Sequence, residues 1–145
     1  MLDDVGGFNA GLSRNEDQEW LFRVCLAGWR IAGIDAELVD YRTSPTGLAA
    51  DIDALLADFE LVLIEARRRA PGLVAALEPR ARARTHRYLA RRALRLGVDR
   101  KTARRHMGCA LRHAPGLLVS EPRATIATLL AAMLPASPLF AQALG

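Results

Sequence analysis

The chain has 145 residues, of which 51% are hydrophobic and 6% aromatic, and its formal net charge is +4. This length provides one modest hydrophobic core, and the abundance of Ala, Leu and Arg favours helix. The two cysteines show no metal-type spacing, so a zinc scaffold is excluded and buried thiols in a reducing cytoplasm are expected. The longest apolar run, residues 124–134, is too short to cross a bilayer, and the acidic N-terminus does not resemble a signal peptide.

The charge is divided unequally along the chain. Residues 1–65 hold thirteen acidic residues against four arginines, whereas residues 66–145 hold three acidic residues against sixteen basic ones. A basic C-terminal region of this kind is suited to meet nucleic acid, anionic lipid or the acidic half of the same chain. It also fits an ordinary solvated helical surface.

The N-terminal segment is predicted to be helical on both sides of a glycine-rich loop. Residues 1–5 resemble the last turn of a helix that ends at Gly6-Gly7. Asn15 is a suitable N-cap with Gln18 in capping-box position, and apolar residues recur at helical spacing over residues 16–28.

The rest of the chain is predicted to be extended first and helical afterwards. Residues 30–35 and 38–42 are expected to form a short β pair with a turn near Asp35, before a loop around Pro45. Further on, apolar residues recur every three or four positions, and glycine or proline separates the segments. Helices are expected at residues 48–69, 79–96, 99–113 and 121–134.

Glu16 and Asp17 place two carboxylates in the first turn of the predicted helix 16–28. The helix dipole favours acids at this position by a few tenths to about 1 kcal/mol, so capping alone explains the pair. A carboxylate behind a glycine-rich loop is also able to serve as a general base when substrate excludes water around it.

The order of motifs around this pair resembles the acceptor side of family-2 glycosyltransferases, which are inverting enzymes of the glycosyltransferase-A fold. The resemblance covers roughly residues 2–60. Its motifs are Gly6-Gly7-Phe8-Asn9, Glu16-Asp17-Gln18-Glu19-Trp20, Gly28-Trp29-Arg30-Ile31 and the run from Ile34 to Tyr41-Arg42.

The resemblance implies a role for each matching residue. Asp17 would remove the proton from the acceptor hydroxyl, and Glu16 would help to position the acceptor. The expected partners are a nucleotide-sugar donor and a saccharide or lipid-linked acceptor. The acceptor-binding residues implied are Gly6, Gly7, Phe8, Trp20, Tyr41 and Arg42. Ser44 departs from the pattern, because many relatives carry a histidine there.

The nucleotide-binding half of such an enzyme, with its metal-binding Asp-x-Asp, is expected to be missing. Asp51-Ile52-Asp53 matches the Asp-x-Asp pattern, but it lies in a predicted helix past the acceptor region, so it is not expected to bind the metal. The chain alone is therefore expected to be inactive and to hold no metal, with Mg²⁺ or Mn²⁺ needed only by the full-length enzyme. The predicted fold is a mostly α, α+β truncated glycosyltransferase-A part over residues 1–47, followed by an Arg/Ala-rich helical region over residues 48–145.

Residues 90–107 support a different hypothesis, a helix-turn-helix DNA-binding protein. Ala93 precedes the turn glycine Gly97 by four residues, and basic residues follow in a segment that resembles transposases and repressors. Two points weaken this hypothesis. Ala103 and His106 stand where larger apolar residues usually pack, and a simple helical hairpin with a glycine at its turn accounts for the same sequence. Under the glycosyltransferase interpretation, nucleic acid is not an expected partner. In the helix-turn-helix hypothesis, the residues that would contact phosphates or base edges are Arg100, Lys101, Arg104 and Arg105.

A third hypothesis places the basic C-terminal helices on an anionic membrane surface, through apolar residues between Ile126 and Phe140. It is compatible with a glycosyltransferase that is cytoplasmic and peripheral at the inner face of the membrane. His86, His106 and His113 have no ligand-type spacing, so they are expected on helix surfaces and no metal site is predicted.

Overall fold

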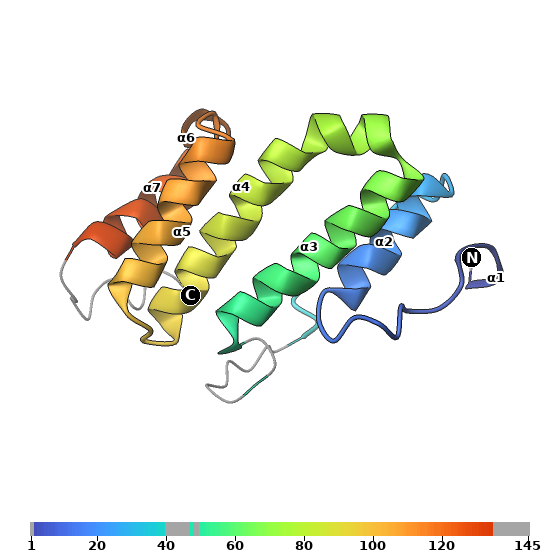
Figure 1. Ribbon diagram of the computed structural model, residues 1–145, viewed down its shortest axis with the longest axis horizontal. Helices are drawn as coiled ribbons and strands as arrows, with labels where there is room; N and C mark the ends of the chain where they lie inside the picture. The colour runs from blue at the N-terminus through green and yellow to red at the C-terminus, as the bar shows by residue number, and fades with distance from the viewer. Residues whose placement is uncertain (1, 40–46, 48–49, 135–145) are drawn as a thin grey trace. The chain divides into compact units, whose positions relative to one another are not determined.

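The computed structural model describes residues 2–39, 47 and 50–134, and α-helices make up the regular structure of these residues (Figure 1). The chain divides into two compact units, Met1–Pro71 and Gly72–Gly145. The described residues contain no strand. The prediction of an α+β fold with a short β pair is therefore wrong, and the described part of the protein is all-α. None of its helices is both long and apolar enough to cross a bilayer.

The first unit consists of α1 (Leu2–Val5), α2 (Glu16–Leu26) and α3 (Ile52–Arg69). α2 lies beside α3, and α1 contacts α2 (Figure 1). Two polar contacts join the segment before α2 to α3: Arg14 forms a 3.7 Å ion pair with Asp58, and the Asn15 amide donates to the Leu55 carbonyl at 3.3 Å. The buried apolar residues of α2 and α3 are Val24, Ile52, Leu55, Phe59, Val62, Leu63 and Ala66.

Glycines end α1 and α2 as the sequence predicted. Gly6 follows α1 with φ 73°, and Gly28 follows α2 with φ 85°. At the second of these ends, the Gly28 N–H donates to the Cys25 carbonyl at 3.0 Å and the Trp29 N–H donates to the Val24 carbonyl at 3.2 Å. These two bonds form a Schellman motif, in which only glycine takes the left-handed position without strain.

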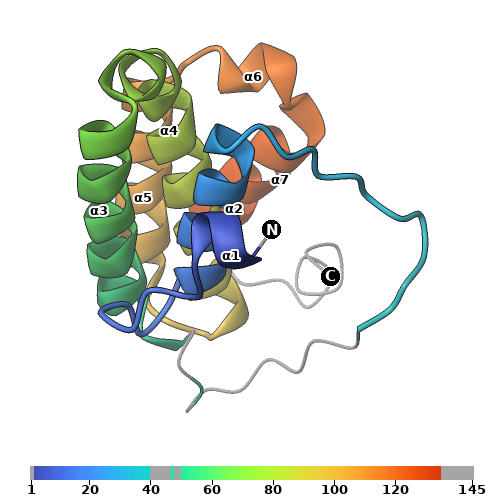
Figure 2. The same ribbon diagram turned by 90° about the vertical axis from the view of Figure 1, so that its right-hand side faces the viewer.

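The two segments that were expected to pair as strands do not do so in the described residues. Residues 30–39 leave α2 as an irregular loop (Figure 2). Residues 40–42 lie outside the described part of the chain. A run of apolar residues does not by itself form a strand, because a strand needs a neighbouring strand to hydrogen-bond with and a hydrophobic surface to pack against. Four apolar side chains of the loop are instead exposed to solvent: Ile31, Ile34, Leu38 and Val39.

The second unit contains α4 (Pro71–Arg95), α5 (Arg100–His113), α6 (Leu117–Ser120) and α7 (Pro122–Met133). α4 begins eight residues before the predicted start at residue 79, and Pro79 lies inside it. Pro71 occupies the first helical position, where a missing N–H costs nothing, so it starts a helix. Figure 1 shows the ribbon of α4 changing direction in its first half, as an internal proline leads one to expect.

Small residues and one arginine bring the helices of the second unit together. α5 contacts α7, and α6 contacts α7. The Arg100 guanidinium donates to the carbonyls of Ala131 (2.7 Å) and Leu134 at the end of α7. Small side chains allow helix axes to approach closely, so this core depends on alanine more than on large residues. Its fully buried alanines include Ala83, Ala90, Ala93, Ala103, Ala110 and Ala132.

The turn between α4 and α5 is built by one glycine and one aspartate. Gly97 has φ 68°, and the Val98 N–H donates to the Ala93 carbonyl at 3.0 Å, which closes a second Schellman motif. Asp99 then accepts bonds from the backbone N–H and the hydroxyl of Thr102, both at 2.9 Å. These bonds to the ionised form, the backbone bond first, lower the pKa of the Asp99 carboxyl.

Glu121 joins the start of α7 to three arginines of α4. Its carboxylate accepts from Arg87 Nη2 and from Arg84 Nε, both at 2.6 Å, and lies 3.4 Å from Arg80 Nη2. These arginine side chains, Arg87 first and Arg84 second, lower the pKa of Glu121 from 4.5 to about 2. The carboxylate therefore stays ionised well into the acid range.

We expect the Glu121 cluster to make a pH-dependent contribution to stability. Because the folded-state pKa lies below the ordinary value of 4.5, the contribution is complete above that pH and is lost as the pH falls toward about 2. Urea unfolding of the wild type and of Glu121→Gln measures it: the stability difference between the two should shrink on acidification. A difference that stays constant over that pH range would contradict this.

Candidate functional site

The two carboxylates that were predicted to act in sugar transfer lie at the start of α2. Glu16 is half-buried, and Asp17 is exposed with its Oδ1 accepting the Gln18 N–H at 2.8 Å. Asn15 is the N-cap residue, but it has φ 58° and its side chain makes no cap hydrogen bond. The predicted capping box is therefore wrong, because the Asn15 side chain contacts α3 instead.

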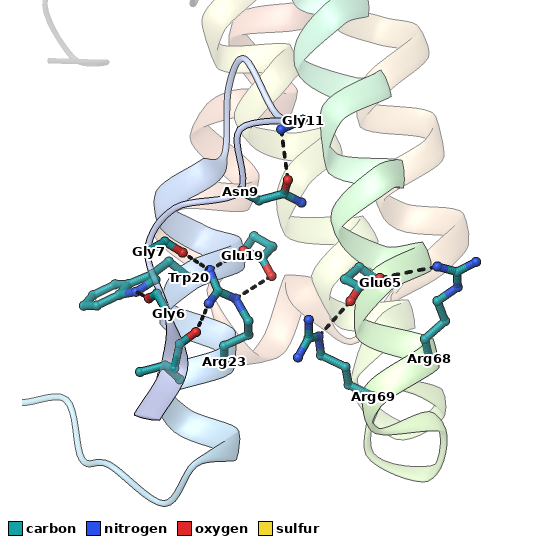
Figure 3. Close-up of polar contacts among 11 residues, drawn as sticks. Gly6, Gly7, Asn9, Gly11, Glu19, Trp20, Arg23, Glu65, Arg68 and Arg69 are labelled. Atoms are coloured by element: carbon teal, nitrogen blue, oxygen red, sulfur yellow. Dashed lines mark hydrogen bonds and ion pairs between the residues drawn. The ribbon is translucent and has the colours of Figure 1, made fainter. Parts of the chain in front are cut away.

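The glycine loop and Trp20, predicted to bind an acceptor, are brought together by contacts with one another (Figure 3). The Trp20 indole N–H donates to the Gly6 carbonyl at 2.9 Å, and the rings of Phe8 and Trp20 lie 5.6 Å apart. Arg23 donates to the carbonyls of Val5 and, at 2.6 Å, Gly7. Contacts within the first unit thus explain why these residues stand together. The other two predicted acceptor residues, Tyr41 and Arg42, lie outside the described residues.

Arg23 itself belongs to a buried ion pair that the sequence interpretation did not single out. Its Nε and Nη2 donate to the two carboxylate oxygens of Glu19 at 2.8 Å and 2.9 Å. The two side chains are 10% and 3% exposed. The sequence signal was a Glu–Arg pair four residues apart, which is common on exposed helix faces and does not reveal burial.

An open hollow of about 340 Å³ lies beside this ion pair in the first unit. Glu16 and Asp17 are not among its lining residues. The hollow is lined by Asp4, Val5, Arg23, Leu26, Ala27 and Arg69.

The three histidines meet where α4 and α5 contact each other. The Nδ1 atoms of His86 and His106 lie 2.9 Å apart, and the rings of His86 and His113 stack with centroids 5.6 Å apart. His86 and His106 are buried, so the prediction of surface positions is wrong for these two residues. Within the described residues, no group of three or more His, Cys, Asp or Glu side chains is arranged to hold a metal ion.

The outward face of α5 is basic along its whole length. Its exposed residues recur at three- and four-residue spacing, so they lie on one side of the helix. They are Lys101, Arg104, Arg105, Gly108, Arg112 and, at the end of the helix, His113. We call the first five the α5 basic face. The opposite side of the helix is buried through Ala103, His106, Met107 and Ala110.

The second unit has few acids with which to neutralise this face. Residues 72–145 contain three acidic residues against thirteen basic ones. Glu78 pairs with Arg82 at 2.7 Å and Glu121 binds the arginines of α4, whereas Asp99 caps α5 beside Lys101. Like charges also crowd on α4, where burial and then the neighbouring Arg95 and Arg87 lower the pKa of Arg91. The unit therefore carries a large positive potential.

The helices on either side of Gly97 run side by side instead of diverging. His86 contacts both His106 and His113, which is the last residue of α5, so α4 and α5 stay together as an antiparallel hairpin. The helices of a DNA-binding helix-turn-helix instead cross at roughly 90–120°. The local turn features of that motif are present, whereas the helix arrangement differs from it.

Comparison of the chain with protein-family models, with curated proteins and with solved structures finds no match. Together with the lack of strands in the described residues, this overturns the expectation of a family-2 glycosyltransferase with the glycosyltransferase-A fold. The roles of Glu16, Asp17 and the acceptor residues were derived from that resemblance alone. They stay untested predictions.

The burial of the Glu19–Arg23 pair leads to a prediction about stability. Arg23→Ala leaves a buried carboxylate without its partner, so we expect a loss of about 3 kcal/mol or more in the free energy of unfolding. Arg69→Ala is the matched control, because Arg69 and Glu65 share the four-residue spacing and the 2.8 Å distance but are 46% and 29% exposed. Its expected cost is about 1 kcal/mol or less. Urea unfolding of both variants measures the difference, and equal losses would contradict it.

Proposed function

We propose that the second unit binds nucleic acid through the α5 basic face. The observation that carries this proposal is the arrangement of four cations on one exposed side of a single helix, with no carboxylate on that helix. Phosphate binding by such a face gains free energy by releasing condensed counterions from the nucleic acid. Arginine adds geometric fit, because its guanidinium is able to hold a phosphate with two parallel hydrogen bonds.

The rigid support of the basic face favours the same proposal. α5 is capped by Asp99 at its N-terminus, holds the end of α7 through Arg100, and buries its inner side within the unit. The face therefore keeps its spacing before any ligand arrives. A basic segment whose helix is already formed loses less backbone conformational entropy on binding than a disordered one does.

The distribution of apolar residues favours a polyanion over a lipid surface as the partner of α5. A helix that lies in a membrane interface needs exposed apolar residues beside its cations. The apolar side of α5 is buried within the unit, and the α5 basic face carries four cations and one glycine. Exposed apolar side chains occur on a different helix, α7, at Ile126, Leu130 and Met133.

Salt-dependent binding tests this proposal. We expect fluorescence anisotropy to show binding of a labelled nucleic acid that weakens as salt rises. Lys101→Ala/Arg104→Ala should reduce the steepness of log Kd against log salt by about 2, because two phosphate contacts are lost. Arg68→Ala/Arg69→Ala is the matched control, since it removes two exposed cations from the other unit and should leave the slope unchanged.

Two outcomes would contradict the proposal. One is the absence of any binding to nucleic acid at low salt. The other is sedimentation of the protein with vesicles of anionic lipid, reduced by Ile126→Ser/Leu130→Ser on α7, without binding to nucleic acid. That second result would favour a membrane-surface function.

A further inference from the structure

Gly108 lies in the middle of the α5 basic face, at a position where the fold has no need of glycine. It is exposed, and a Cβ atom added there would meet nothing within 4 Å. Its backbone is not in the left-handed region, unlike that of Gly97. A glycine inside a helix costs about 1 kcal/mol relative to alanine. Neither packing nor backbone geometry within the protein offsets this cost.

The neighbours of Gly108 are cations on both sides. Arg104 lies one turn before it and Arg112 one turn after it, so two guanidinium groups flank a patch of bare helix backbone. The two arginines are separated by about 12 Å along the helix axis. The missing side chain therefore creates the place on this face where another molecule can approach α5 most closely.

Building on the proposed function, we propose that the partner is B-form double-stranded DNA, that α5 enters its major groove, and that Gly108 marks the point of closest approach. The major groove is about 12 Å wide and admits an α-helix. In that position the arginines and Lys101 reach phosphates along the groove edges, while the bare backbone at Gly108 faces the groove floor.

The chemistry of α5 argues against two other nucleic acids. Proteins that bind single strands without sequence preference stack the bases on aromatic side chains, and α5 contains no Phe, Tyr or Trp. The major groove of A-form RNA is too deep and narrow to admit a helix. A basic helix with a glycine at its centre therefore fits double-stranded DNA better than it fits either alternative.

Substitution of Gly108 separates this inference from a purely structural role. Gly108→Ala and Gly108→Gln should raise the thermal unfolding midpoint or leave it unchanged, because both residues favour helix over glycine. The same variants should weaken binding to a DNA duplex, Gly108→Gln by on the order of tenfold, because the new side chain holds the helix away from the groove. The salt slope should not change, since no charge is removed.

Gly72 provides the matched control. It is an exposed glycine near the start of α4, in the same unit, and a Cβ atom there would also meet nothing within 4 Å. Gly72→Ala and Gly72→Gln should therefore change stability in the same direction as the Gly108 variants while leaving duplex affinity unchanged.

The comparison of ligands distinguishes failure of this inference from failure of the proposed function. DNA duplex, single-stranded DNA and RNA duplex of one sequence are titrated into the wild type and Gly108→Gln. Selective weakening of the DNA duplex supports the inference. Wild-type affinity of Gly108→Gln for the DNA duplex, or equal weakening for all three ligands, overturns it while nucleic-acid binding stands. The absence of binding by the wild type to any of the three overturns the proposed function itself.

Discussion

The second unit has too few carboxylates to neutralise its arginines, and its arrangement depends on this constraint. Residues 72–145 hold three acidic residues against thirteen basic ones, so the basic residues outnumber the carboxylates that could pair with them. Glu121 alone contacts Arg80, Arg84 and Arg87, so one charge holds α4 to the start of α7. Among the remaining cations, those of the α5 basic face are exposed. The helix where they gather without a carboxylate is α5.

Alanine packing decides which side of α5 carries this charge. Ala103 and Ala110 of α5 are fully buried, so this side of α5 is enclosed within the unit, where α5 also contacts α7. The sharp turn at Gly97 keeps α4 and α5 together, and the histidine contacts show that they remain so to the end of α5. Because a helix has only one outward side in such a hairpin, Lys101, Arg104, Arg105 and Arg112 are presented together.

The first unit shows how residues that resemble a catalytic motif can have a local structural explanation. Trp20 donates to the carbonyl of Gly6 and Arg23 to that of Gly7, and Arg23 is held in turn by the buried carboxylate of Glu19. These contacts explain, without a catalytic role, why a glycine loop is followed by a helix that begins with acidic residues and a tryptophan. The resemblance to a glycosyltransferase rested on these letters and on a strand pair, and the described residues contain no such pair.

Local signals in the sequence determined much of the helical framework, because helix ends depend on residues that are neighbours in the chain. Gly6, Gly28 and Gly97 end or separate helices where the sequence predicted, and amphipathic spacing located α2, α3, α5 and α7 within a few residues. The exceptions were α4, where Pro71 starts a helix instead of preventing one, and the short α6, which falls between the predicted helices. The tertiary structure alone decided two other kinds of feature. One is contact between distant residues, as in the meeting of His86 and His106 and the cluster around Glu121. The other is which residues are buried, such as the Glu19–Arg23 pair, and which are exposed, such as residues 30–39. Periodicity shows which residues share a helix face, whereas the choice of face to be buried depends on which other helix lies against it.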